Sequence, residues 1–174
     1  MKPGSLCLCA LLALAAAPVV SGNDFPTTGP EVPGNRAALY GNLAAAPAAA
    51  PLAVKRAIWA ANQLRAKPYR YGGGHRSFTD SAYDCSGTVS YALGAAGLVP
   101  SPMSSSDFRR YGSSGAGKWI TVYARHGHTF AVIAGLRLDT TPFNTMRRDR
   151  NWAPRWQATP RQPRGFEARH PAGL

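Results

Sequence analysis

Cysteine and histidine are the residue types in this chain that could combine into a nucleophile and its base. With residues 1–22 set aside as an export signal, Cys85 is the only cysteine left. Cysteines of exported proteins usually occur in pairs, and a single one is either an intermolecular bridge or a reactive thiol. Cys85 opens a stretch with apolar residues at helical spacing, and the first turn of a helix favours the thiolate. The pattern predicts an activated nucleophile, and the alternative is an inert buried cysteine.

A base for this thiol has to come from one of four histidines, which are His75, His126, His128 and His170. A rigid element positions a catalytic base best. This favours His128, which stands at the start of an apolar, strand-like stretch. His126 is the close competitor.

A third group should orient the imidazole, and the expected strand pairing suggests one. If a tight turn at residues 134–135 pairs Ile133 with Leu136, Asp139 lies on the same face as His128, one diagonal step away. A register slip by one residue would send Asp139 to the other face. An ordinary solvated acid paired with Arg137 is the alternative. The predicted catalytic residues are therefore Cys85, His128 and Asp139, the last conditional on the register.

The elements that must position these residues change type along the chain. Apolar residues recur at helical spacing in the first half and in strand-like runs in the second, which indicates an α+β fold with an antiparallel sheet. Helices are expected over 54–64, from Cys85 to Gly97 and from Ser104 to Tyr111, and strands over 119–123, 129–134 and 136–140.

The chain divides into three parts by composition. Residues 1–22 predict a secretory signal peptide, whose apolar run is shorter than the roughly 20 residues that cross a bilayer. Residues 23–51, rich in Ala, Pro and Gly, predict a flexible leader. Residues 52–174 predict a single catalytic domain with a basic extension from about residue 142. We expect an exported, monomeric protein in the periplasm or outside the cell, with no transmembrane anchor.

The formal net charge of +12 favours a polyanionic partner. For an exported protein, an anionic cell-envelope polymer fits this charge, and no nucleic-acid partner is expected. The basic extension interleaves arginines with Trp152, Trp156 and Phe166. Such a pattern can bind sugar polymers or single strands, or it can cover a small core while the guanidinium groups stay in water. We favour the second interpretation.

Three groups of residues occur in a characteristic order: Tyr69 to Gly73, then Asp84 to Gly87, then the stretch that opens at His128. Over about residues 54–141, this order and spacing resemble the NlpC-type cell-wall cysteine peptidases. The resemblance implies a papain-like domain in which N-terminal helices, including a nucleophile helix, pack on an antiparallel sheet. It also implies hydrolysis of peptidoglycan stem peptides, typically between D-glutamate and the diamino acid, with no cofactor and no metal.

By the same resemblance, Cys85 attacks the scissile carbonyl, His128 moves the proton and Asp139 takes the third position. Tyr69, Asp84 and Ser86 would line the substrate site, with Asp84 facing the free amine of a stem peptide. Two departures stand out, because residues 115–118 replace the usual Pro-Gly-Asp turn and an aspartate replaces the third residue, most often a histidine.

Two other functions fit the same residues. A papain-like amidase or acyl transferase would use the same pair on a different amide or ester, since a fold does not fix its chemistry. A non-catalytic basic wall-binding protein would keep Cys85 for structure alone.

Overall fold

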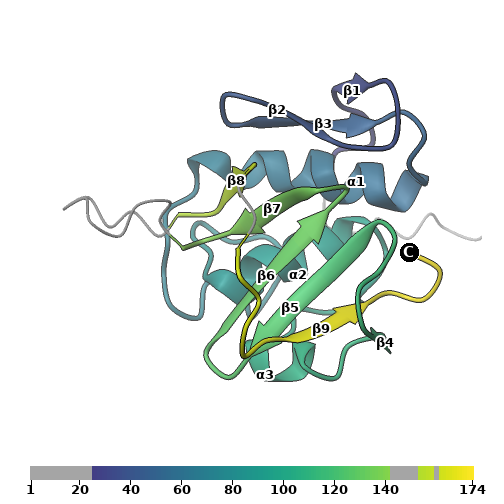
Figure 1. The fold of residues 1–174 in the computed structure, drawn as a ribbon. Helices are drawn as coiled ribbons and strands as arrows, with labels where there is room; N and C mark the ends of the chain where they lie inside the picture. Colours follow the sequence, from purple (N-terminus) through teal and green to yellow (C-terminus); the bar gives the residue numbers. More distant parts are fainter. Residues whose placement is uncertain (1–24, 142–152, 159–160) are drawn as a thin grey trace, which may run out of the picture.

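The computed structural model describes residues 25–141, 153–158 and 161–174. The predicted signal peptide, residues 1–22, lies outside the described residues, as do Trp152 and the first part of the basic extension. The described chain is α+β, as the change of periodicity predicts: a six-stranded antiparallel sheet is covered by helices, and a smaller sheet packs beyond them (Figure 1).

The main sheet takes its strands from the second half of the chain. Neighbouring strands are antiparallel throughout. In order across the sheet, the strands are β4 (Ser113–Ser114), β9 (Glu167–His170), β5 (Ile120–Arg125), β6 (His128–Ile133), β7 (Leu136–Asp139) and β8 (Arg155–Gln157).

The helices come first in the chain and cover one face of this sheet. Helix α1 (Leu52–Ala61) continues into the 3-10 helix η1 (Asn62–Ala66), and α3 is a single turn (Ser105–Phe108). Helix α2 (Cys85–Ala95) packs on β6 and β7, and α1 packs on α2. Within the described residues, no helix is long and apolar enough to cross a membrane.

The core lies between the helices and the sheet because strand side chains alternate between the two faces. Ala131, Ile133 and Leu138 are fully buried in it. On the opposite face, Tyr123 and Phe130 stack with ring centroids 4.9 Å apart. One face of β6 thus carries aliphatic core residues, and the other carries an aromatic pair.

The predicted turn between β6 and β7 is confirmed. Ala134 and Gly135 both have positive φ, 48° and 92°, as a two-residue hairpin turn requires. Ile133 pairs with Leu136, the register on which the placement of Asp139 depends.

The prediction of a flexible leader over residues 23–51 is wrong for the described part of that segment. Residues 25–51 include β1 (Glu31–Val32), β2 (Ala38–Tyr40) and β3 (Leu43–Pro47), which form a three-stranded sheet in the order β1-β3-β2. Ala44 and Ala46 lie on one face of β3 and are fully buried in the core with α1, because their small side chains let the strand lie close against the helix. Composition alone suggested a linker, but the alanines are packing residues.

The basic C-terminal segment is part of the main sheet rather than an appendage to it. Strands β8 and β9 pair with β7 and β5 respectively. Trp156 of β8 is 5 % exposed, and its indole Nε1 donates to Asn62 Oδ1 at 3.0 Å. For Trp156, the interpretation as a cover over the core is confirmed.

Candidate active site

Cys85 is the first residue of α2, and Asp84 caps this helix. Asp84 Oδ1 accepts from the Gly87 N–H at 2.8 Å, and the Thr88 hydroxyl donates to the Asp84 carbonyl at 2.7 Å. A side-chain cap of this kind satisfies one of the free N–H groups at a helix start. The cap therefore holds the backbone of Cys85 in place at the positive end of an 11-residue helix.

The glycine-rich turn before the helix supports the same residues. The Gly73 carbonyl accepts from the Asp84 N–H at 3.2 Å. A Cβ on Gly87 would collide with this carbonyl, so the residue after Ser86 has to be glycine. The turn and the helix start form one rigid unit.

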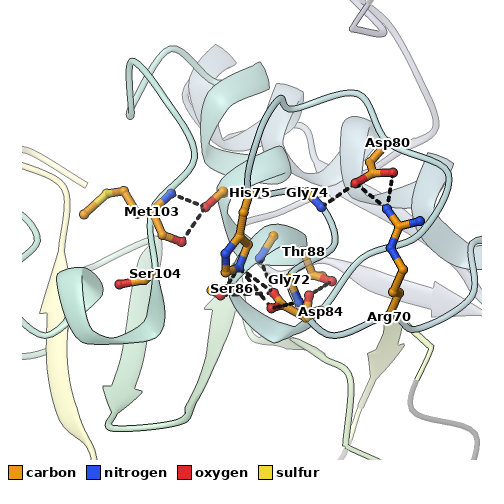
Figure 2. A network of polar contacts seen from close by, with 12 residues as sticks. Arg70, Gly72, Gly74, His75, Asp80, Asp84, Ser86, Thr88, Met103 and Ser104 are labelled. Carbon is orange, nitrogen blue, oxygen red and sulfur yellow. Dashed lines mark hydrogen bonds and ion pairs between the residues drawn. The ribbon is translucent and has the colours of Figure 1, made fainter.

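The other end of the turn is held by Asp80. Asp80 Oδ2 accepts from the Gly74 N–H at 2.9 Å, and Arg70 contacts both carboxylate oxygens (Figure 2). The Gly74 N–H is the main cause that lowers the pKa of Asp80 well below its usual range, and the N–H of Ser81 and the guanidinium of Arg70 add to it.

The electrostatics of the Cys85 thiol differ from the expectation. Cys85 is 8 % exposed, and burial is the main cause that raises its pKa. The backbone N–H groups of Thr129 and Ser86 act in the opposite direction, whereas the carboxylates of Asp84 and Asp139 add to the rise. The helix start does favour the thiolate, through the Ser86 N–H, but burial and two nearby carboxylates outweigh this effect.

His128 and Asp139 form a buried pair on neighbouring strands. His128 Nε2 lies 3.1 Å from Asp139 Oδ1, with side-chain exposures of 11 % and 0 %. The expected placement of Asp139 beside His128 is confirmed. An ionised carboxylate can only accept, so Nε2 carries the proton and Nδ1 is left as the acceptor.

The Asp139 carboxylate is held in its ionised form. Burial alone would raise its pKa, but the hydrogen bonds from His128 and from the Thr141 N–H, with the charges of His128 and Arg161, lower it overall. The alternative of a solvated acid does not apply, because Asp139 is buried, although its carboxylate does pair with Arg137, whose Nε lies 3.7 Å from Oδ2.

Arg161 belongs to the site, although no sequence pattern singles it out. Its Nη1 donates to Asp139 Oδ2 at 3.0 Å and to Thr141 Oγ1 at 2.6 Å, and it lies 3.4 Å from His128 Nε2. The guanidinium also stacks over the rings of Phe130 and Phe166. In the sequence it is one of many arginines in the basic segment, with no distinguishing motif.

A hollow of about 250 Å³ opens beside the thiol. The three residues that the resemblance assigns to substrate binding, Tyr69, Asp84 and Ser86, line it together with Cys85, whereas His128 and Asp139 do not. Burial raises the pKa of Tyr69, with the nearby Cys85 and Asp84 as further causes, so the phenol lies close to both. The other lining residues are Tyr71, Gly72, His75, Ser104, Ser105, Ser106, His126 and Gly127.

His75 also belongs to the site, and sequence reasoning missed its role. Its Nε2 lies 2.9 Å from Asp84 Oδ2 and 2.9 Å from Ser86 Oγ. Figure 2 shows the imidazole reaching from the loop after the glycines to the start of α2. The only sequence signal was its position, nine residues before Asp84.

The remaining histidines do not replace His128 as the partner of Asp139. His126 is exposed in the turn between β5 and β6 and lines the hollow, and His170 Nδ1 lies 3.1 Å from the Gly115 carbonyl oxygen. Within residues 25–141, 153–158 and 161–174, no group of three or more His, Cys, Asp or Glu side chains is arranged to hold a metal ion.

The chain was compared with known families, curated proteins and solved structures. No family model matches it, and no curated protein and no solved structure gives a significant match.

Proposed function

We propose that this protein is an exported cysteine peptidase, with a papain-like NlpC-type domain, that hydrolyses amide bonds in peptidoglycan stem peptides. The observation that carries the proposal is the position of the Cys85 thiol. It lies at a helix start, beside a hollow, and next to the backbone of the residue that follows His128, whose imidazole is paired with a buried carboxylate.

The raised pKa of Cys85 means that its proton has to be moved during the reaction. His128 takes this proton on Nδ1 while the sulfur forms a bond to the scissile carbonyl carbon, and the carbonyl electrons move to oxygen. The N–H groups near the thiol, those of Ser86 and Thr129, are the candidate donors to this oxyanion.

Collapse of the tetrahedral intermediate breaks the C–N bond, and His128 returns the proton to the leaving amine. Water then attacks the thioester with His128 again as base, which releases the acid and restores the thiol. Asp139 remains ionised throughout and stabilises the imidazolium, as the acid of a triad does.

The substrate class rests on the resemblance around Cys85 and on charge. A stem peptide of D-glutamyl and diamino-acid residues belongs to an anionic wall, and a protein of net charge +12 is attracted to such a surface. The preferred scissile bond is the D-glutamyl–diamino acid amide.

A second candidate is a non-catalytic basic wall-binding protein. The observation in its favour is the raised pKa of Cys85, because a protonated, buried thiol is a poor nucleophile without a base. The peptidase would turn over substrate only with an intact Cys85 thiol, whereas the binding protein would not turn over substrate at all. An amidase or acyl transferase would depend on it too but leave the wall intact.

The test is mass spectrometry of purified peptidoglycan fragments after incubation with the protein, beside the Cys85→Ala variant. We expect free L-alanyl-D-glutamate, or a stem truncated at that bond, only with the intact thiol. Binding of fragments without any thiol-dependent product would favour the binding protein. Turnover of a different acyl substrate would favour the amidase or transferase.

A further inference from the structure

His75 occupies the position at which the resemblance would place the amine of a substrate. It comes from the loop after the glycine turn, and its side chain is 37 % exposed while that of Asp84 is 4 % exposed. The imidazole thus lies between a buried carboxylate and the hollow that it lines.

The Asp84 carboxylate has no free acceptor position for a substrate. A carboxylate has about four lone-pair sites. Oδ1 accepts from the Gly87 N–H and from the Ser86 hydroxyl at 3.0 Å, and Oδ2 accepts from the Gly72 N–H at 3.0 Å. His75 Nε2 fills what remains, at 2.9 Å from Oδ2 and 3.1 Å from Oδ1.

A free amine could reach this carboxylate only by displacing the imidazole. Three of the four protein donors belong to the helix cap and to the glycine turn, which are part of the fold. Asp84 is also the only carboxylate among the residues that line the hollow. An ammonium group in the hollow would therefore lose its water without gaining a free negative partner, which is unfavourable.

We propose that the His75–Asp84 pair makes this cleft selective for stem peptides without a free amino terminus, that is, for peptides N-acylated as in intact peptidoglycan. This inference rests on the proposed function and names its substrate class. It replaces the expectation that Asp84 faces the free amine of a stem peptide.

The Nδ1 atom of the His75 imidazole suits an N-acylated substrate. Nε2 is committed to Asp84 and Ser86, while Nδ1 has no hydrogen-bond partner among the described residues. The acyl-amide N–H of an N-acylated residue can donate to a neutral Nδ1, and its acyl carbon chain adds no charge to the hollow. Tyr71, which is 89 % exposed, lies at the same hollow and offers an aromatic surface for the acyl group.

The experiment compares two synthetic peptides, L-Ala-γ-D-Glu-diaminopimelate with a free amino terminus and the same peptide N-acetylated. We expect the protein to cleave the N-acetylated peptide with a kcat/KM higher by roughly tenfold or more, because the free amine has to displace the His75 imidazole from its hydrogen bond to the buried Asp84 carboxylate. His75→Ala should raise cleavage of the free-amine peptide and reduce this ratio. His75→Gln should fall between the two, because its amide can still donate to Asp84.

His126→Ala is the matched control, since His126 lines the same hollow without a contact to Asp84. The ratio between the two peptides should not change in this variant, whatever happens to the overall rate. A preference of the protein for the free-amine peptide, or an unchanged ratio in His75→Ala, would overturn the inference.

A binding measurement separates this inference from the proposed function. Alaninamide and N-acetylalaninamide are titrated into the protein while the imidazole signals of His75 are followed by NMR. If neither peptide is cleaved, the proposed function fails. The inference then stands if only N-acetylalaninamide shifts His75 and fails if alaninamide shifts it or if neither does.

Discussion

Two histidine–aspartate pairs lie in the region around Cys85, and they are built in different ways: Asp84 and Asp139 both raise the pKa of its thiol. The pair in the sheet, His128 and Asp139, is buried on adjacent strands, and a guanidinium and the Thr141 N–H hold its carboxylate. The carboxylate of the other pair, His75 and Asp84, is held by backbone N–H groups of a helix start and a glycine turn. Its imidazole is a loop side chain exposed to the hollow.

The difference teaches that the same two side chains can serve two purposes according to their support. An imidazole locked between strands keeps its free nitrogen in one direction, which a general base needs. An imidazole on a loop above a buried carboxylate can instead cover that carboxylate. In the proposed function, the sheet pair therefore serves proton transfer and the loop pair serves substrate selection.

The largest expected effect separates the two histidines. His128→Ala should reduce kcat/KM on the N-acetylated stem peptide by roughly 10³-fold or more, because it removes the base, and Cys85→Ala should do the same. His75→Ala should change this value by no more than about tenfold, because it removes one interaction with substrate. Steady-state kinetics of the three variants check this.

The control for these variants is His170→Ala, an equally small change on β9 outside the hollow. Circular dichroism and the melting temperature should show that all four variants are folded. If a folded His128→Ala variant turns over substrate at close to the original rate, His128 is not the base. The contrast between the two pairs then fails as well.

A smaller loss of rate is expected when the Asp139 carboxylate of the sheet pair loses its charge. Asp139→Asn keeps the size of the side chain but removes the charge that orients and stabilises the His128 imidazolium. The rate should fall less than in His128→Ala, because in a triad the loss of the acid costs roughly 10²-fold less than the loss of the base or the nucleophile.

The same variant should also be less stable, by up to about 3 kcal/mol, because Arg161 and Arg137 lose their shared anion. The pKa of Asp139 is lowered in the folded protein, so its contribution is present above the unfolded value of about 3.9 and is lost as the pH falls. Urea unfolding at pH 7 and at pH 3.5 tests this. A stability difference that does not shrink at the lower pH would contradict an ionised Asp139.

The smallest effect concerns the reactivity of the thiol. Burial raises the pKa of Cys85 in the intact protein, so the alkylation of the thiol by iodoacetamide should have its midpoint above about 8.5, the value of free cysteine. In His128→Ala the midpoint should lie higher still, because this variant lacks the imidazole that accepts the proton. Rates measured from pH 5 to pH 10 give both midpoints. Identical profiles would mean that the sheet pair does not act on Cys85.

The parts of the site that could be predicted depend on local rules. The apolar spacing after Cys85 predicts a helix that opens at the thiol, and the turn at Ala134 and Gly135 sets a register that brings Asp139 to His128. In both cases, residues close in sequence determine the geometry. The α+β class follows from the change of periodicity in the same way.

The parts that were missed depend on contacts between distant segments. Arg161 reaches Asp139 from 22 residues away, and no pattern distinguishes it from the arginines around it. The prediction of a flexible leader fails because alanines carry no periodic signal. In the structure, the Ala44 N–H donates to Asn62 Oδ1 and the Ala44 carbonyl accepts from Asn62 Nδ2, a contact between segments 18 residues apart. The direction in which the pKa of Cys85 shifts depends on its burial and on the nearby carboxylates of Asp84 and Asp139, which the sequence alone does not show.

The place of β9 in the sheet has a consequence for the order of events during synthesis. This strand, Glu167–His170, lies between β4 and β5, so the edge of β5 has no partner until those residues have left the ribosome. The indole of Trp156 likewise reaches Asn62 across 94 positions. Contacts of such long sequence separation carry a large loop-closure cost and slow folding. The growing chain therefore cannot complete this sheet, or hold Arg161 against the Asp139 carboxylate, before residues 155–170 have been synthesised.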